Sequence, residues 1–98
     1  MQKIIWLDSA VNDLVRLRTF VAAKNPKAAI KIAKVLKKAV IKLEALPNTG
    51  KPVDDLPDYR DLPISFGAAG YMLRYRIYEG SVYIVHIKHY RERRFKIN

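Results

Sequence analysis

Residues 70–96 read GYMLRYRIYEGSVYIVHIKHYRERRFK, and this stretch decides the fold. Side chains alternate along 71–78, and the run from 81 to 87 is rich in β-branched and aromatic residues, so both segments are predicted to be strands. Glu79 and Gly80 separate them, and glycine supplies the positive φ that a tight hairpin turn needs. We expect a long β-hairpin in the middle of a sheet, followed by a basic tail.

The start of the chain predicts a strand and a helix. The strand is expected over residues 3–7, and Asp8 or Ser9 is expected to cap the helix that follows. This helix is predicted over 10–24 from the spacing of its apolar residues. The apolar stripe consists of Val11, Leu14, Leu17 and Val21, and the residues expected away from it are Asn12, Asp13, Arg16 and Arg18.

A second helix is predicted to begin at Asn25 and Pro26, because asparagine caps helices and proline fits their first position. Its apolar stripe consists of Ala29, Ile32, Ala33, Leu36, Ala39, Val40 and Leu43. Two prolines and a glycine in residues 47–52 are expected to end it near Leu46.

An acidic loop over 53–59 and a strand over 60–66 complete the predicted order β, α, α, β, β, β. Pro63 cannot donate to a strand ladder, so its nitrogen is expected to face away from a partner strand or to lie at a bulge. The order predicts an α+β two-layer sandwich, with an N-terminal helical hairpin packed on a small, mainly antiparallel sheet.

The composition fits one domain over residues 1–98, with 50% hydrophobic residues for a single core. The chain has no cysteine, and no apolar run approaches the roughly 18–20 residues of a membrane span, so we expect a cytoplasmic protein without a membrane partner. No metal or cofactor is expected, since no carboxylate cluster, histidine pair or glycine-rich loop has a suitable spacing. The net charge of +10 favours a polyanion or an acidic protein as partner.

Four segments carry a resemblance to a known family: WLDSAVNDLVRL, NPKAAIKIAKVLKKAVIKLEALPNTGKPV, YRDLPISFGAAGYMLRYRI and VYIVHIKHYRERRF. In this order and spacing the chain resembles the RelE/ParE superfamily of toxins from bacterial type II toxin-antitoxin systems. The resemblance implies a cognate antitoxin whose C-terminal segment, net acidic, wraps the toxin across the helical hairpin and along a sheet edge. It also implies that operator DNA is bound only through the antitoxin complex.

The two branches of this superfamily imply different activities. RelE-like members are ribosome-dependent messenger RNA endoribonucleases, and ParE-like members inhibit DNA gyrase by protein binding. The candidate nuclease residues are Arg60, His89 and Arg91. Arg60 and Arg91 match basic positions of the RelE-like pattern, and His89 is a candidate because a histidine can accept a proton near neutral pH. Leu62, Met72 and Ile97 stand where that pattern has basic or tyrosine residues. Because GYMLRYRI and VHIKHYRE are similar to the ParE-like branch, the sequence favours a gyrase inhibitor over an enzyme.

Two cationic sets are candidate binding surfaces. One set is expected to bind the target or a partner and consists of Arg74, Arg76, Arg91, Arg93 and Arg94. The other set is expected to face the antitoxin and consists of Lys27, Lys31, Lys34 and Lys38. Each set has a plainer interpretation, as a solvated sheet face whose arginines pair with aspartates and as the solvated side of an amphipathic helix.

Further alternatives remain open for single residues and for the whole chain. His89 can be a surface hydrogen-bonding group, and the strand tyrosines can stack on bases or simply pack across strands. His86 lies three residues from His89, on the opposite face of the strand, so the two are not expected to share a metal. A non-toxic nucleic-acid-binding or autoregulatory module is the remaining alternative to both toxin activities.

Overall fold

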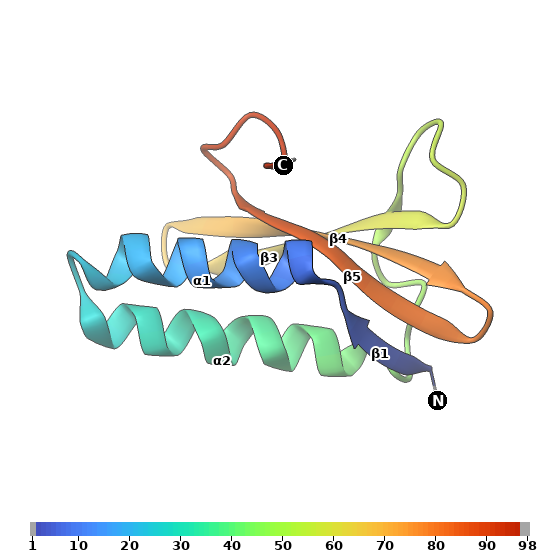
Figure 1. The fold of residues 1–98 in the computed structure, drawn as a ribbon, viewed down its shortest axis with the longest axis horizontal. Helices are drawn as coiled ribbons and strands as arrows, with labels where there is room; N and C mark the ends of the chain where they lie inside the picture. The colour runs from blue at the N-terminus through green and yellow to red at the C-terminus, as the bar shows by residue number, and fades with distance from the viewer. Residues whose placement is uncertain (1, 97–98) are drawn as a thin grey trace.

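The computed structural model describes residues 2–96 and has the expected α+β architecture, with two helices on one face of a five-stranded sheet (Figure 1). The elements follow in the order β1 (Lys3–Trp6), α1 (Asp8–Ala22), α2 (Pro26–Lys42), β2 (Lys51–Pro52), β3 (Tyr59–Phe66), β4 (Ala69–Tyr78) and β5 (Ser81–His89). Neither helix of this part of the chain has the length and apolar character needed to cross a bilayer.

The sheet has the strand order β1-β5-β4-β3-β2, so the β4–β5 hairpin lies in its middle as predicted. Only β1 pairs in parallel, with β5, and the remaining neighbours are antiparallel. Glu79 and Gly80 form the hairpin turn with φ of 46° and 78°, the left-handed values that a tight two-residue connection requires. The short strand β2 was not predicted, because two residues, one of them Pro52, carry no strand periodicity.

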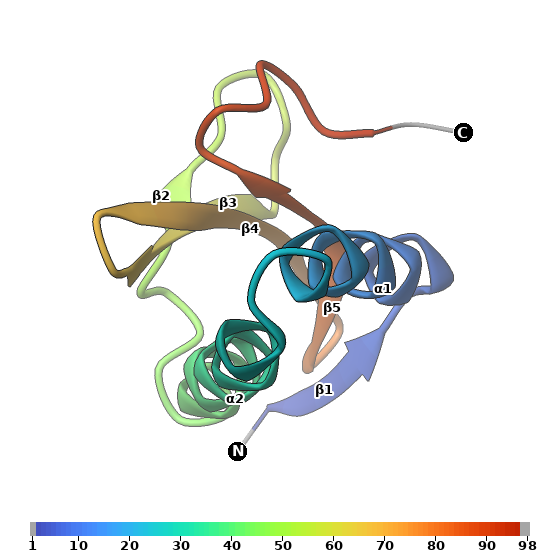
Figure 2. The same cartoon turned by 90° about the vertical axis from the view of Figure 1, so that its left-hand side faces the viewer.

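The core lies between the sheet and α2. Ile32, Leu36 and Val40 of α2 are almost fully buried, and the facing sheet contributes Leu73 and Ile84, which are both inaccessible. Figure 2, viewed nearly along the helix axes, shows α2 beneath the sheet and α1 to the side, next to β5. The start of α2 is confirmed, since the Asn25 side chain accepts a hydrogen bond from the Ala28 amide at 3.1 Å. Its end is four residues earlier than predicted, at Lys42.

Helix α1 differs from its prediction at both its cap and its buried stripe. Leu7 occupies the N-cap without a side-chain hydrogen bond, whereas Asp8 and Ser9 lie within the helix. The buried residues are Ala10, Asp13 and Leu17, and Val11 is 41% exposed. Leu14, Leu17 and Val21 pack in or against the core as predicted, whereas the placements of Val11 and Asp13 were wrong. The reason is that polar side chains of α1 bind the backbone of β5: Ser9 Oγ donates to the Val85 carbonyl at 2.5 Å, and the Asp13 carboxylate accepts from the Ile87 amide at 2.9 Å.

Candidate functional site

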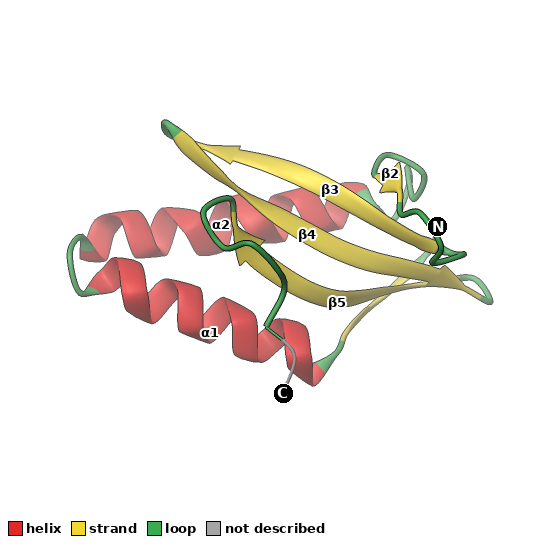
Figure 3. Ribbon diagram, turned by 90° about the horizontal axis from the view of Figure 1, so that it is seen from above, coloured by secondary structure: helices red, strands yellow, loops and turns green. Residues whose placement is uncertain are grey.

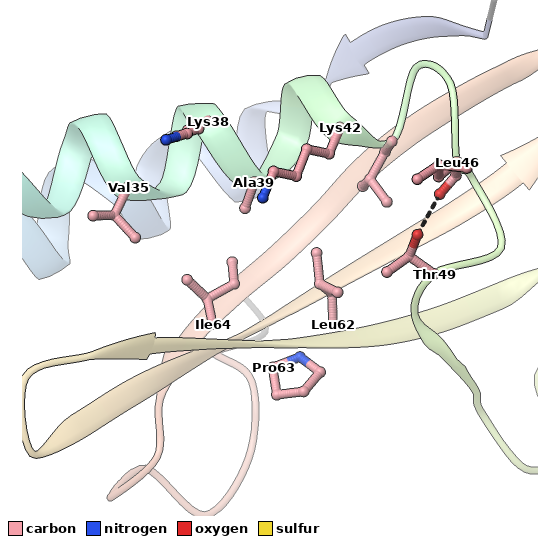
Figure 4. Close-up of a pocket in the computed structure, with 10 residues that line it drawn as sticks. Val35, Lys38, Ala39, Lys42, Leu46, Thr49, Leu62, Pro63 and Ile64 are labelled. Atoms are coloured by element: carbon pink, nitrogen blue, oxygen red, sulfur yellow. Dashed lines mark hydrogen bonds between the residues drawn. The ribbon is translucent and has the colours of Figure 1, made fainter.

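A groove of about 390 Å³ separates the last turns of α2 from β3 (Figure 4). Its walls are formed by Val35, Lys38, Ala39, Lys42, Leu43, Leu46, Thr49, Leu62, Pro63 and Ile64. Seven of these side chains are apolar, and Lys38 and Lys42 contribute two cations. Leu46 is 63% exposed, although it is a large apolar residue. Such a surface fits an apolar segment that also carries negative charge.

The edge of β3 beside this groove is open. The strand β2 pairs only with Arg60 and Asp61, so residues 62–66 have β4 on one side and no strand of the described chain on the other. Pro63, which has no amide hydrogen, lies in this stretch, where β2 has ended and no strand of the described chain pairs with this side of β3. Backbone groups along the groove are therefore accessible to an added strand.

The opposite edge of the sheet is closed by side chains. Beyond Ile84, β5 still pairs with β4 but has no strand on its other side among residues 2–96, because β1 pairs only with residues 81–84. Ser9 and Asp13 bind the backbone of Val85 and Ile87, and the Glu92 carboxylate accepts from the His89 amide at 2.9 Å. Arg16 links these groups, with nitrogen–oxygen distances of 2.8 Å to Glu92 and 3.4 Å to Asp13.

Arg60 supports the loop that follows α2. Its guanidinium donates to the carbonyl of Gly50 at 2.6 Å and to that of Asn48 at 3.2 Å. The neighbouring Tyr75 hydroxyl accepts from the Gly50 amide at 2.8 Å and donates to the Pro47 carbonyl at 2.6 Å. Burial raises the pKa of Tyr75, against opposing effects of the Gly50 hydrogen bond and the Arg60 charge. The Arg60 guanidinium is thus bound to this turn.

His89 and Arg91 lie together at the other end of the hairpin. The Arg91 amide donates to Nδ1 of His89 at 3.0 Å, and the imidazole stands edge-on to Tyr71 with 5.3 Å between ring centroids. Arg60 pairs with Tyr75 on β4, whereas His89 pairs with Tyr71, so the two positions are separated by about 13 Å along the strand and by β4 itself. The structure does not bring Arg60 close to the other two nuclease candidates, and Ile97 lies outside the described residues.

The C-terminal tail passes over the open face of the sheet (Figure 3), and Phe95 of this tail contacts Arg74 of β4. Arg74 makes a bidentate pair with Asp61, at 2.8 and 2.9 Å, and this hydrogen bonding raises the pKa of the guanidinium. Phe95 folds back over the pair, with its ring centroid 4.6 Å from the Arg74 guanidinium carbon. His86, the register partner of Arg74 on β5, also lies near this ring, with 5.8 Å between ring centroids, and it binds Asp13 through Nδ1 at 2.9 Å.

The other members of the two cationic sets are accessible. Arg91, Arg93 and Arg94 are exposed on the tail, and Arg76 is partly exposed between two tyrosines. Lys27, Lys31, Lys34 and Lys38 are all exposed on α2. Of these four lysines, Lys38 lines the groove.

The family described as "ParE toxin of type II toxin-antitoxin system, parDE" matches residues 4–94. The chain belongs to the ParE toxin family. The predicted membership of the RelE/ParE superfamily is therefore confirmed, and an antitoxin protein is the partner that this family implies.

Curated relatives of this ParE-family chain include three toxins of Caulobacter vibrioides. It is 33% identical to "Toxin RelE1" over 85 residues, which cover 87% of the chain and 89% of the relative. "Toxin RelE3" is 34% identical, with 87% and 90% covered, and "Toxin RelE2" is 30% identical, with 91% and 96% covered. A chain of the solved "Chromosomal ParDE TA system from P. aeruginosa" has the same fold, with a TM-score of 0.74, 20% identity and coverage of 91% and 96%.

The sequence analysis missed the groove and the closed edge of this ParE-family fold. Val35 widens the apolar arc of α2 beyond the predicted stripe, which already included Ala39, and this extra width was the available signal for the groove. The role of Asp13 could not be read from its position, because the spacing of one helix does not show which strand edge it meets.

Proposed function

We propose that this protein is a type II toxin that acts by binding a protein target, DNA gyrase, and is neutralised by an antitoxin in the α2–β3 groove. The observation that carries the proposal is the separation of the nuclease candidates. Arg60 donates to the backbone carbonyls of the loop after α2, while His89 and Arg91 lie at the far end of β4 and β5. Cleavage of RNA needs base, acid and cationic groups around one phosphate, so this arrangement favours binding over catalysis.

The proposed antitoxin segment is apolar and net acidic. The apolar groove walls would bury its hydrophobic side chains, and Lys38 and Lys42 would pair with its carboxylates. The open edge at residues 62–66 would pair with its backbone by β-augmentation. The exposed Lys27, Lys31 and Lys34 extend the same cationic character along α2.

A supercoiling assay with purified gyrase tests the proposal. We expect the protein to abolish supercoiling and to trap cleaved DNA, and we expect the cognate antitoxin to reverse both effects. In the same assay Arg93→Ala should weaken inhibition while melting like the wild type, because Arg93 is exposed on the tail. Lys3→Ala, an exposed cation on β1, is the matched control. Unaffected gyrase at concentrations that stop growth would overturn the proposal.

The second candidate function is ribosome-dependent cleavage of messenger RNA. Two observations favour it: the Arg91 backbone amide donates to Nδ1 of His89, which keeps these two candidates adjacent, and the curated relatives are named RelE. In that case His89→Ala and Arg91→Ala should abolish cleavage at unchanged melting temperature, and gyrase should remain active.

A further inference from the structure

Arg76 differs from the other partly buried arginines of the described chain in having no acceptor. Arg16 binds carboxylates, Arg60 binds backbone carbonyls, and Arg74 binds Asp61. Within residues 2–96 the Arg76 guanidinium makes no hydrogen bond or ion pair, and its Nε is buried without a partner, as is the Nε of Arg16, whose other nitrogens bind carboxylates. A guanidinium has five donors in a planar fork, and leaving the buried Nε donor among them unpaired is costly. An anion from outside the described chain would satisfy this donor and its neighbours in the fork.

Tyrosines surround this guanidinium. Its carbon lies 4.5 Å from the ring centroid of Tyr78 and 5.6 Å from that of Tyr59. Tyr83 of β5 is the register partner of Arg76 on the adjacent strand. Stacked aromatic rings hold a guanidinium in place and limit its contact with water, so a bound anion would meet a preorganised fork.

The charges around the site distinguish a nucleic-acid phosphate from a protein carboxylate as the bound anion. Asp58 precedes Tyr59 and Glu79 follows Tyr78, and both acidic residues are exposed. The Asp58 carbonyl also accepts from the Ile77 amide at 2.9 Å, which fixes this loop beside Arg76. A nucleic acid presents a continuous row of phosphates and would be repelled by both carboxylates. A protein segment with a single carboxylate beside a basic residue complements all three charges.

We propose that Arg76, with Tyr59 and Tyr78, is a docking site for one carboxylate of a protein partner, with Asp58 and Glu79 receiving its neighbouring basic side chain. The site lies on the open face of the sheet, opposite the helices, so it is separate from the α2–β3 groove. This proposal rests on the proposed function in one respect only: it takes the partner to be the toxin's target and not its antitoxin.

The first test does not depend on the target. The Nε–H resonance of Arg76 in the full chain is followed by NMR during titration with the peptide Ac-KEK-NH₂ or with octathymidylate. We expect the peptide to shift this resonance at millimolar concentration and the peptide Ac-KQK-NH₂ to leave it unchanged. A larger shift with octathymidylate would show a nucleic-acid site, and no shift with either probe would show that no anion site exists; both results overturn the proposal.

The second test uses gyrase and the antitoxin. Arg76→Ala is expected to weaken binding to gyrase about 30-fold, as for arginines at the centre of interfaces, and to leave the antitoxin Kd unchanged. Arg76→Lys keeps the charge without the planar fork and should lose most of the same affinity. Arg18→Ala, an exposed arginine of α1, is the matched control. If wild-type protein does not bind gyrase, the proposed target is wrong, and the NMR titration still decides the carboxylate site.

Discussion

The two long edges of the sheet end in different ways. Past β1, the edge of β5 is occupied by polar side chains: Ser9 binds at Val85, Asp13 at Ile87 and Glu92 at His89. Past β2, the edge of β3 receives no side-chain hydrogen bond from residues 2–96, and an apolar groove runs beside it. An open strand edge invites pairing with another chain, and proteins usually protect it. The difference shows that the fold seals one edge and leaves the other open to an added strand, where we propose that the antitoxin binds.

Among the variants that test this difference between the two edges, Asp13→Ala should change the free energy of unfolding the most. It removes the acceptor for the buried Ile87 amide and for Nδ1 of His86, and an unsatisfied buried donor together with a lost charged hydrogen bond costs about 3 kcal/mol. The free energy of unfolding, measured by urea denaturation, should fall by this amount. Asp13→Asn keeps one acceptor oxygen and should lose about half as much.

Asp8→Ala is the control for that measurement. Asp8 is exposed in the first turn of the same helix, so it tests the loss of a negative charge near the N-terminus without touching β5. If Asp13→Ala destabilises the protein no more than Asp8→Ala does, the edge of β5 does not need the carboxylate and the comparison fails.

Lys38→Glu addresses the open edge. Lys38 lines the groove and is exposed, so reversing its charge should leave thermal stability unchanged and weaken binding of a net acidic antitoxin about tenfold. Isothermal titration of the purified pair at two salt concentrations gives the affinity and the electrostatic part of it. The matched control is Lys37→Glu, which reverses a charge on the adjacent exposed residue outside the groove. Equal effects of the two variants would show that total charge matters and the groove does not.

The sequence predicted the elements whose signals are local. The alternation of residues 71–78, the Glu79–Gly80 turn and the Asn25–Pro26 helix start each depend on the backbone preferences of a few neighbouring residues, and all three are confirmed. The family match also followed from the order of such segments.

What the sequence did not reveal depends on contacts between distant segments. Asp13 meets Ile87 across 74 residues, and Glu92 meets Arg16 across 76, so neither partner can be read from the pattern of one element. The pairing of Arg74 with Asp61 depends in the same way on strand register. For this reason the sequence grouped Arg74 with Arg76, although the structure gives a carboxylate partner only to the first of them within residues 2–96.

The smallest predicted effect concerns Tyr71, which lies beside the closed edge. Burial, and then the negative charge of Glu92, raise the pKa of its hydroxyl above the ordinary value of about 10. Above that pH the unfolded chain releases a proton that the folded chain retains, so this stability is fully present below pH about 10 and is lost as the pH rises through the folded-state pKa.

Tyr71→Phe should therefore make the free energy of unfolding fall less steeply with pH above about 10, and should leave it nearly unchanged at pH 7. Urea denaturation at pH 7 and at several alkaline pH values measures both quantities. Glu92→Gln removes the smaller cause of the shift, so it should reduce the alkaline slope by less than Tyr71→Phe does. It retains an acceptor for the His89 amide, which separates the charge of Glu92 from its hydrogen bond at the edge of β5. An alkaline slope that is the same in wild type and both variants would mean that Tyr71 keeps its ordinary contact with solvent, and that the tail does not close this edge in solution.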